Sequence, residues 1–150
     1  MAEPYHFEDF AAGQSFASRT RAVGAEEIIA FAREFDPQPM HVDRETAQAL
    51  FGGLIASGWH TAALSMRLMI DGGLPPLAPG SVGLGVERLS WPEPVRPGDT
   101  LAIEANILSV RPSRSRPDRG LVSVLTTTRN QKGRVVLEMT STILVPRRPA

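Results

Sequence analysis

The sequence predicts an α+β domain in which an antiparallel sheet curls around one buried helix. In the first half of the chain, apolar residues recur every three to four positions, whereas from about residue 81 onward they recur at every second position. Between these regions, residues 58–70 form a helix-length segment that is apolar or small on nearly every face, which is typical of a buried helix. A sheet with one apolar face covers such a helix economically.

Length and composition narrow the class of protein. A chain of 150 residues suits one domain with a substantial core, so we expect a single domain over residues 1–150. The 16 basic and 16 acidic residues cancel, and this balance argues against nucleic-acid binding. The absence of cysteine excludes disulfides and thiolate metal sites. No segment has the pattern of a signal peptide or a membrane span, and we expect a cytoplasmic protein.

Three helices are predicted in the first half of the chain. Residues 25–35 carry an apolar stripe at helical spacing and open with two glutamates, which the positive end of a helix favours. A shorter helix is predicted over residues 44–49, with Asp43 as its N-cap. The third is the buried helix over residues 58–70, for which Ser57 is a natural N-cap.

Four strands are predicted in the second half, where apolar and polar residues alternate. They cover residues 81–91, 100–111, 120–130 and 134–145. The segments between them are rich in proline, glycine, asparagine and serine, as turns are. Consecutive antiparallel pairing into a meander is the simplest arrangement of these strands.

The segment from Asp36 to His41 places an acid and a base close together in the sequence. Fully extended, its five residue steps would separate the two by roughly 16 Å, too far to act on one atom. Pro37 and Pro39 disfavour helix for the residues before them, so the preceding helix should end at Asp36. We expect a non-helical turn, outside the core, that directs both side chains into one pocket.

Three motifs together resemble the MaoC-type members of the hotdog-fold superfamily, the group that contains the (R)-specific enoyl-CoA hydratases. The resemblance covers nearly the whole chain. It depends on Asp36-x-x-Pro39-x-His41-x-Asp43, on Phe51-Gly52-Gly53-Leu54-Ile55-Ala56-Ser57-Gly58, and on Arg96-Pro97-Gly98-Asp99-Thr100. It implies a single hotdog domain, an acyl-CoA substrate, no cofactor, and a homodimer or a higher homo-oligomer.

The resemblance also implies roles for individual residues. Asp36 and His41 match the catalytic acid and base of the family, and the backbone of Gly58 matches its oxyanion donor. Ser57 and Trp59 are candidate substrate-binding residues. Neutral histidine is a suitable base near neutral pH, and an unpaired amide at a helix start suits a developing enolate oxygen. No metal site is expected, because the three histidines lack the spacing of ligands.

Structural interpretations compete with these roles. Asp36 is also placed to end a helix, and His41 is also consistent with a structural, hydrogen-bonded histidine. An N-cap is the favoured role for Asp43, and a core position is favoured for His60. Two departures from many hydratases, Gln38 where they have asparagine and Ser57 where they have histidine, are compatible with a different acyl group or reaction direction.

The implied reaction is the reversible addition of water to a trans-2-enoyl-CoA, giving an (R)-3-hydroxyacyl-CoA. A hotdog acyl-CoA thioesterase is one alternative, and a non-catalytic acyl-CoA-binding protein is another. The sequence leaves open the length and branching of the acyl chain, and whether the acyl group is carried by coenzyme A or by acyl-carrier protein.

A cluster of four arginines lies between the second and third predicted strands: Arg111, Arg114, Arg116 and Arg119. Such a cluster suits a phosphate site, but a solvated loop is the favoured interpretation. The sequence does not decide between a phosphate-binding role and a solvated position for Arg88 and Arg96 either.

Overall fold

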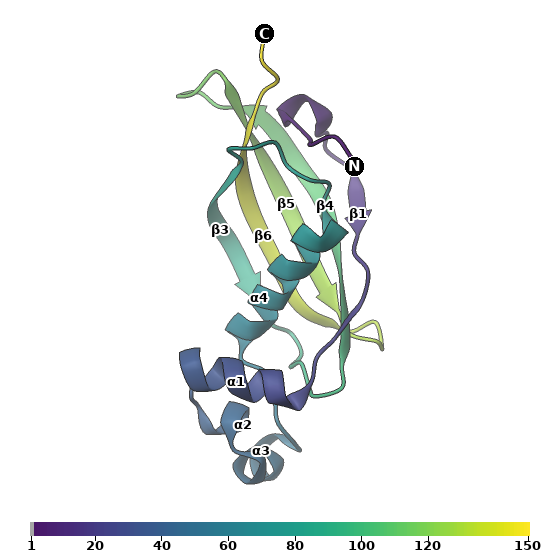
Figure 1. The fold of residues 1–150 in the computed structure, drawn as a ribbon, viewed down its shortest axis with the longest axis vertical. Coiled ribbons are helices and arrows are strands. Elements are labelled where there is room, and N and C mark those ends of the chain that lie inside the picture. The colour runs from purple at the N-terminus through teal and green to yellow at the C-terminus, as the bar shows by residue number, and fades with distance from the viewer. Residues whose placement is uncertain (1) are drawn as a thin grey trace.

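The computed structural model describes residues 2–150 and consists of one antiparallel sheet with a helix across it and a helical cluster at one end (Figure 1). In chain order the elements are η1 (Phe7–Asp9), β1 (Ser15–Ala17), β2 (Arg21–Ala22), α1 (Ala25–Phe35), α2 (Pro39–Val42), α3 (Arg44–Phe51), α4 (Gly58–Leu68), η2 (Met69–Gly73), β3 (Val82–Ser90), β4 (Thr100–Pro112), β5 (Arg119–Arg129) and β6 (Val135–Pro146). The four predicted strands are confirmed to within one residue at each end.

The sheet has the order β1-β4-β5-β6-β3, with β2 also paired to β4. The predicted hairpins β4–β5 and β5–β6 are confirmed, and Thr126 of β5 pairs with Ala105 on one side and Met139 on the other. The tight turn between β5 and β6 closes through Gly133, whose φ of 75° lies in the left-handed region that glycine adopts without strain.

The predicted meander is wrong for the first of its strands. β3 pairs with β6, in a register that runs from Val82 opposite Leu144 to Ser90 opposite Glu138, and so lies at the sheet edge. The proline-rich connection over residues 91–99 does not form a hairpin, and the far side of β4 is taken by β1 and β2. Those two strands escaped prediction because three and two residues are too few to show a period.

Helix α4 lies across one face of the sheet (Figure 1). Its inward residues Leu64 and Leu68 are buried in the same core as three residues of the sheet, Ile103, Val124 and Leu137. Ser65 is buried as well. The prediction that this helix is buried on every face is wrong for the single chain, because Met66 and Arg67 are exposed. The regular helix also ends at Leu68 and continues as the π-helical turn η2, which closes at Gly72 with a φ of 124°.

Helices α1, α2 and α3 gather at one end of the sheet, next to the start of α4 (Figure 1). The predicted N-cap of α3 is confirmed, because the Asp43 carboxylate accepts hydrogen bonds from the backbone N–H groups of Glu45 and Thr46. The expected non-helical turn before it is wrong. Pro39 opens the short helix α2 instead, since proline is pre-organised for the first helical position.

In residues 2–150, no helix is both long and apolar enough to cross a bilayer. The same part of the chain holds no group of three or more side chains arranged to bind a metal ion.

Candidate active site

Asp36 stands at the junction between α1 and α2. Its backbone N–H still bonds to the Ala32 carbonyl (2.8 Å), but its φ and ψ of −155° and 67° leave the helical region, so α1 ends there as predicted. The carboxylate is held on both oxygens. Gln38 Nε2 donates to Oδ1 (2.6 Å), and Ser57 Oγ donates to Oδ2 (2.7 Å). These two donors fix the direction of the side chain.

His41 projects from α2 into the interior and is only 5% exposed, which corrects the expectation that it lies outside the core. Its Nδ1 is 2.6 Å from the carbonyl oxygen of Ile55. A carbonyl oxygen only accepts, so this contact assigns the proton of the neutral ring to Nδ1. The lone pair of the neutral imidazole is therefore on Nε2.

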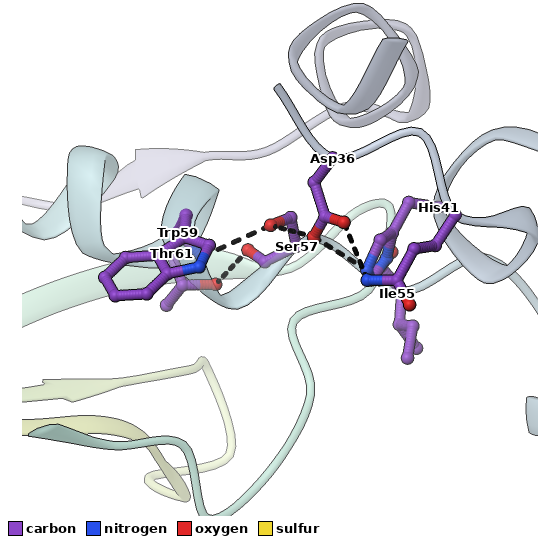
Figure 2. A network of polar contacts seen from close by, with 7 residues as sticks. Asp36, His41, Ile55, Ser57, Trp59 and Thr61 are labelled. Carbon is purple, nitrogen blue, oxygen red and sulfur yellow. Dashed lines mark hydrogen bonds and ion pairs between the residues drawn. The ribbon is translucent and has the colours of Figure 1, made fainter. Parts of the chain in front are cut away.

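The side chains of Asp36 and His41 meet at the two atoms that can accept hydrogen bonds from a water molecule. His41 Nε2 lies 3.4 Å from Asp36 Oδ2, and Figure 2 shows both groups converging beside Ser57. A neutral imidazole nitrogen and an ionised carboxylate oxygen both accept hydrogen bonds, so a water molecule between them can donate one hydrogen to each. The arrangement thus suits the positioning and deprotonation of a water.

The surroundings of Asp36 keep its carboxyl group ionised. The hydrogen bond from Ser57 lowers the pKa of Asp36 most, the one from Gln38 adds to the effect, and the nearby His41 contributes further. Partial burial acts in the opposite direction and is outweighed. At neutral pH the site therefore carries a carboxylate beside the imidazole.

Ser57 connects this acid–base pair to the start of α4. As predicted, it is the N-cap, since its Oγ accepts from the Trp59 N–H (3.3 Å) while donating to Asp36 (Figure 2). Gly58 is the first residue of α4, so its N–H has no partner within the helix. The unpaired amide and the positive end of the helix dipole both favour negative charge at this point.

A cavity of about 450 Å³ brings these parts together. Asp36, Gln38, His41 and Gly58 line it, with a wall of apolar and aromatic residues: Phe51, Ile55, Ala56, Trp59, Trp91, Pro94 and Val95. Thr61 and Glu93 complete the lining. The predicted residues thus share one cavity: Asp36, His41, Gly58 and Trp59. Ser57 lies behind the cavity wall, where its hydroxyl donates to Asp36.

A family model and individual relatives match the chain. The model described as "MaoC like domain" matches residues 9–130. The chain belongs to the MaoC-like domain family. The uncharacterized protein YdeM of Bacillus subtilis is 36% identical over 144 residues, covering 93% of this chain and 98% of YdeM. An (R)-specific enoyl-CoA hydratase of Rhodospirillum rubrum is 29% identical over 151 residues, covering 96% of this chain and 94% of the hydratase.

Solved structures confirm the predicted hotdog fold for this MaoC-like protein. The crystal structure of a MaoC-like dehydratase from Rhodospirillum rubrum superposes with a TM-score of 0.91. It is 52% identical, and the match covers 97% of this chain and 99% of that one.

Trp91 is the principal lining residue that sequence reasoning missed. Its indole packs on Gly58 so closely that a Cβ on that glycine would lie 2.6 Å from the ring atom Cε2. It also forms an edge-to-face pair with Trp59, with ring centroids 5.3 Å apart. The absence of a side chain at Gly58 therefore leaves room for this aromatic ring. The only local signal was a large aromatic residue between the end of a strand and a proline.

The remaining candidates lie elsewhere. His60 is buried in α4 and stacks on Phe31 of α1, with ring centroids 4.6 Å apart, as a core histidine would. The arginine-rich hairpin between β4 and β5 lies at the opposite end of the sheet from α1–α3 (Figure 1). Its Arg119 donates to the Gly80 carbonyl (2.7 Å), a structural contact.

Proposed function

We propose that this MaoC-like protein adds water reversibly to a trans-2-enoyl-CoA and forms an (R)-3-hydroxyacyl-CoA. The observation that carries the proposal is the juxtaposition, in one cavity, of the Asp36–His41 pair and the unpaired amide of Gly58. The relatives support hydratase or dehydratase chemistry in general. The (R) configuration is proposed by analogy with the Rhodospirillum rubrum hydratase.

The site supplies the three groups that the reaction needs. His41 Nε2 accepts a proton from a water that the Asp36 carboxylate orients, and the hydroxide oxygen forms a bond to the β-carbon. Negative charge moves onto the thioester oxygen, where the Gly58 N–H stabilises it. The acid–base pair then returns the proton to the α-carbon. Atoms and charge balance with water and the thioester alone, so the step as written uses no cofactor.

The residues in and behind the cavity wall have separate proposed roles. Trp59 and Trp91 form the aromatic wall against which the acyl or pantetheine portion packs. Trp59 is 60% exposed, so its ring is accessible for this contact. Ser57 acts through Asp36 and not by direct contact with substrate, because its hydroxyl donates to that carboxylate.

We also propose that two copies of the chain associate through β3. In residues 2–150 this strand pairs only with β6, and Leu84 and Val86 on it are 57% and 53% exposed. They line an apolar groove of about 820 Å³, together with Met66 of α4 and Ile70 of η2. The unpaired backbone groups of a long apolar edge strand can pair with another strand, and β3 of a second copy would pair with them in a symmetric contact.

The experiment that tests the function follows two signals from one reaction. Purified protein is mixed with crotonyl-CoA in the presence of a thiol reagent, and the absorbance of the enoyl thioester is recorded beside thiol release. The proposal expects loss of the enoyl absorbance without thiol release, and a product of (R) configuration. Thiol release would instead indicate a thioesterase, and binding with neither signal would indicate a non-catalytic acyl-CoA-binding protein.

A further inference from the structure

Arg96 flanks the candidate site. It directly follows Pro94 and Val95, both of which line the cavity. Its guanidinium Nη2 donates to the carbonyl oxygen of Phe51 (2.7 Å), and Phe51 lines the same cavity. Arg96 itself is not part of the lining, so its charge lies just outside, beside Phe51.

Three arginines at this end of the molecule are paired with an acid, whereas within residues 2–150 Arg33 of α1 and Arg96 are not. Arg134 faces Glu93 at 3.5 Å, Arg44 faces Glu26 at 3.1 Å and Arg21 faces Glu27 at 3.4 Å. Within residues 2–150, no carboxylate oxygen lies within 4 Å of the Arg96 guanidinium nitrogens. A guanidinium has five N–H donors, and the Phe51 carbonyl uses one direction of that fork. The others are available to an anion.

The chemistry of the proposed substrate suits a cation beside the cavity. The Asp36 carboxylate lines the cavity and is negative, so the cavity suits the uncharged acyl and pantetheine parts of the molecule. The phosphate that ends the pantetheine arm would then lie outside it. Arginine is the side chain best matched to phosphate, because its planar fork forms two parallel hydrogen bonds.

We propose that Arg96 binds the phosphate of the phosphopantetheine arm while the Phe51 carbonyl holds its guanidinium in place. This inference depends on the proposed function and assigns the anion-binding residue of that same site. The arginine-rich hairpin between β4 and β5 does not take this role within one chain, since it lies at the opposite end of the sheet (Figure 1). The phosphate is common to coenzyme A and to an acyl-carrier protein.

The protein carries its own reporter for the test. Its two tryptophans, Trp59 and Trp91, both line the cavity, so intrinsic fluorescence follows occupancy of the site without a label. The wild type and Arg96→Gln are titrated with coenzyme A, with 4′-phosphopantetheine and with pantetheine, which has no phosphate. We expect Arg96→Gln to lose about tenfold in affinity for coenzyme A and to match the wild type with pantetheine.

The second ligand identifies the source of the phosphate. A loss with 4′-phosphopantetheine assigns Arg96 to the phosphate shared with acyl-carrier protein, as proposed. A loss confined to coenzyme A would overturn the proposal, because it would place Arg96 at the phosphates that only coenzyme A has. Arg96→Lys, which keeps the charge, should recover part of the affinity, and raising the salt concentration should narrow the difference between wild type and Arg96→Gln.

The matched control is Arg116→Gln, which removes an exposed arginine of the distant hairpin and should bind all three ligands as the wild type does. Equal weakening of coenzyme A and pantetheine in Arg96→Gln would overturn the inference, because it would show a structural role through Phe51. Unchanged affinity for both would overturn it as well. These titrations require no turnover, so the role of Arg96 is decided separately from the outcome of the hydratase assay.

Discussion

Ser57 couples the capping of a helix to the charge of Asp36. Its hydroxyl accepts from the backbone of α4 and donates to the carboxylate, so one side chain orders both the acid and the proposed oxyanion donor. The sequence identified Ser57 as a cap from its position before an apolar run. The bond to Asp36 spans 21 residues and depends on how α1 packs beside α4, which no local pattern records.

Replacing Ser57 by alanine should raise the pKa of Asp36. The hydrogen bond from Ser57 contributes most to the lowered pKa of this carboxyl group, so its loss raises that pKa. The ionised form then disappears at a higher pH, and a carbon-13 NMR titration of the Asp36 carboxyl group in the wild type and the variant measures the change. Loss of the cap also costs about 1 kcal/mol of unfolding free energy.

Ser65→Ala is the matched control for this shift. Its hydroxyl is also buried in α4, but it donates to the Thr61 carbonyl (2.8 Å) and contacts Thr128. This variant should lose stability and keep the wild-type pKa of Asp36. A pKa of Asp36 that is unchanged in Ser57→Ala would show that Ser57 does not control the ionisation of this carboxyl group.

Gly58 and Trp91 should behave as a coupled pair. A Cβ at position 58 would overlap the indole, so Gly58→Ala should cost about 1–3 kcal/mol of unfolding free energy, as overpacking usually does. Adding Trp91→Leu should relieve most of this cost. Denaturant unfolding of the two single variants and the double variant measures the coupling, and strictly additive effects would contradict it.

Helices α1 and α4 are joined by the stack of Phe31 on His60, and this contact should make stability depend on pH. Burial lowers the pKa of His60, with Arg21 adding to this and Glu27 opposing it. The unfolded chain therefore takes up a proton at about pH 6.5, where the folded protein resists it. The unfolding free energy should fall as the pH drops from 7 to 5.

His60→Gln should flatten the pH dependence in that interval, as measured by chemical unfolding at pH 7, 6 and 5. The lowered carboxyl pKa values, such as those of Asp36 and Asp43, act in a separate window, because their stabilising effect is lost only as the pH falls through their own lower range. An equal slope in wild type and His60→Gln would show that His60 does not titrate with unfolding.

Prediction from sequence succeeded where an element is long and failed where it is short or depends on a distant partner. The strands of 9 to 13 residues and the 11-residue helix α1 showed clear periods. Helix α2 has only four residues, about one turn, so proline signals alone pointed to a turn. The position of β3 was missed because the register of strands apart in sequence is set by the whole sheet.

Within residues 2–150 the sheet has one long open edge, at β3, and this edge should control assembly. Replacing Leu84 and Val86 by lysine places charge in the groove beside β3 and should prevent a second copy from pairing there. Sedimentation should show the wild type at twice the mass of the 16.2 kDa chain and the double variant at that mass.

Leu108→Lys is the control for assembly, because Leu108 is also an exposed apolar residue but lies on β4, away from the groove. It should sediment as the wild type does. A wild type that sediments as a single chain, or a double variant that still pairs, would contradict association through β3.

The central claim is that the Asp36–His41 pair activates the water, and a comparison of two aspartates tests it most directly. Hydration of crotonyl-CoA is measured for Asp36→Asn and for Asp43→Asn, beside their melting temperatures. Asp43 is an N-cap that asparagine replaces well, so that variant should keep full turnover. Asp36→Asn should fold and lose about 10²- to 10⁴-fold in kcat. A folded Asp36→Asn protein with wild-type turnover would contradict the claim.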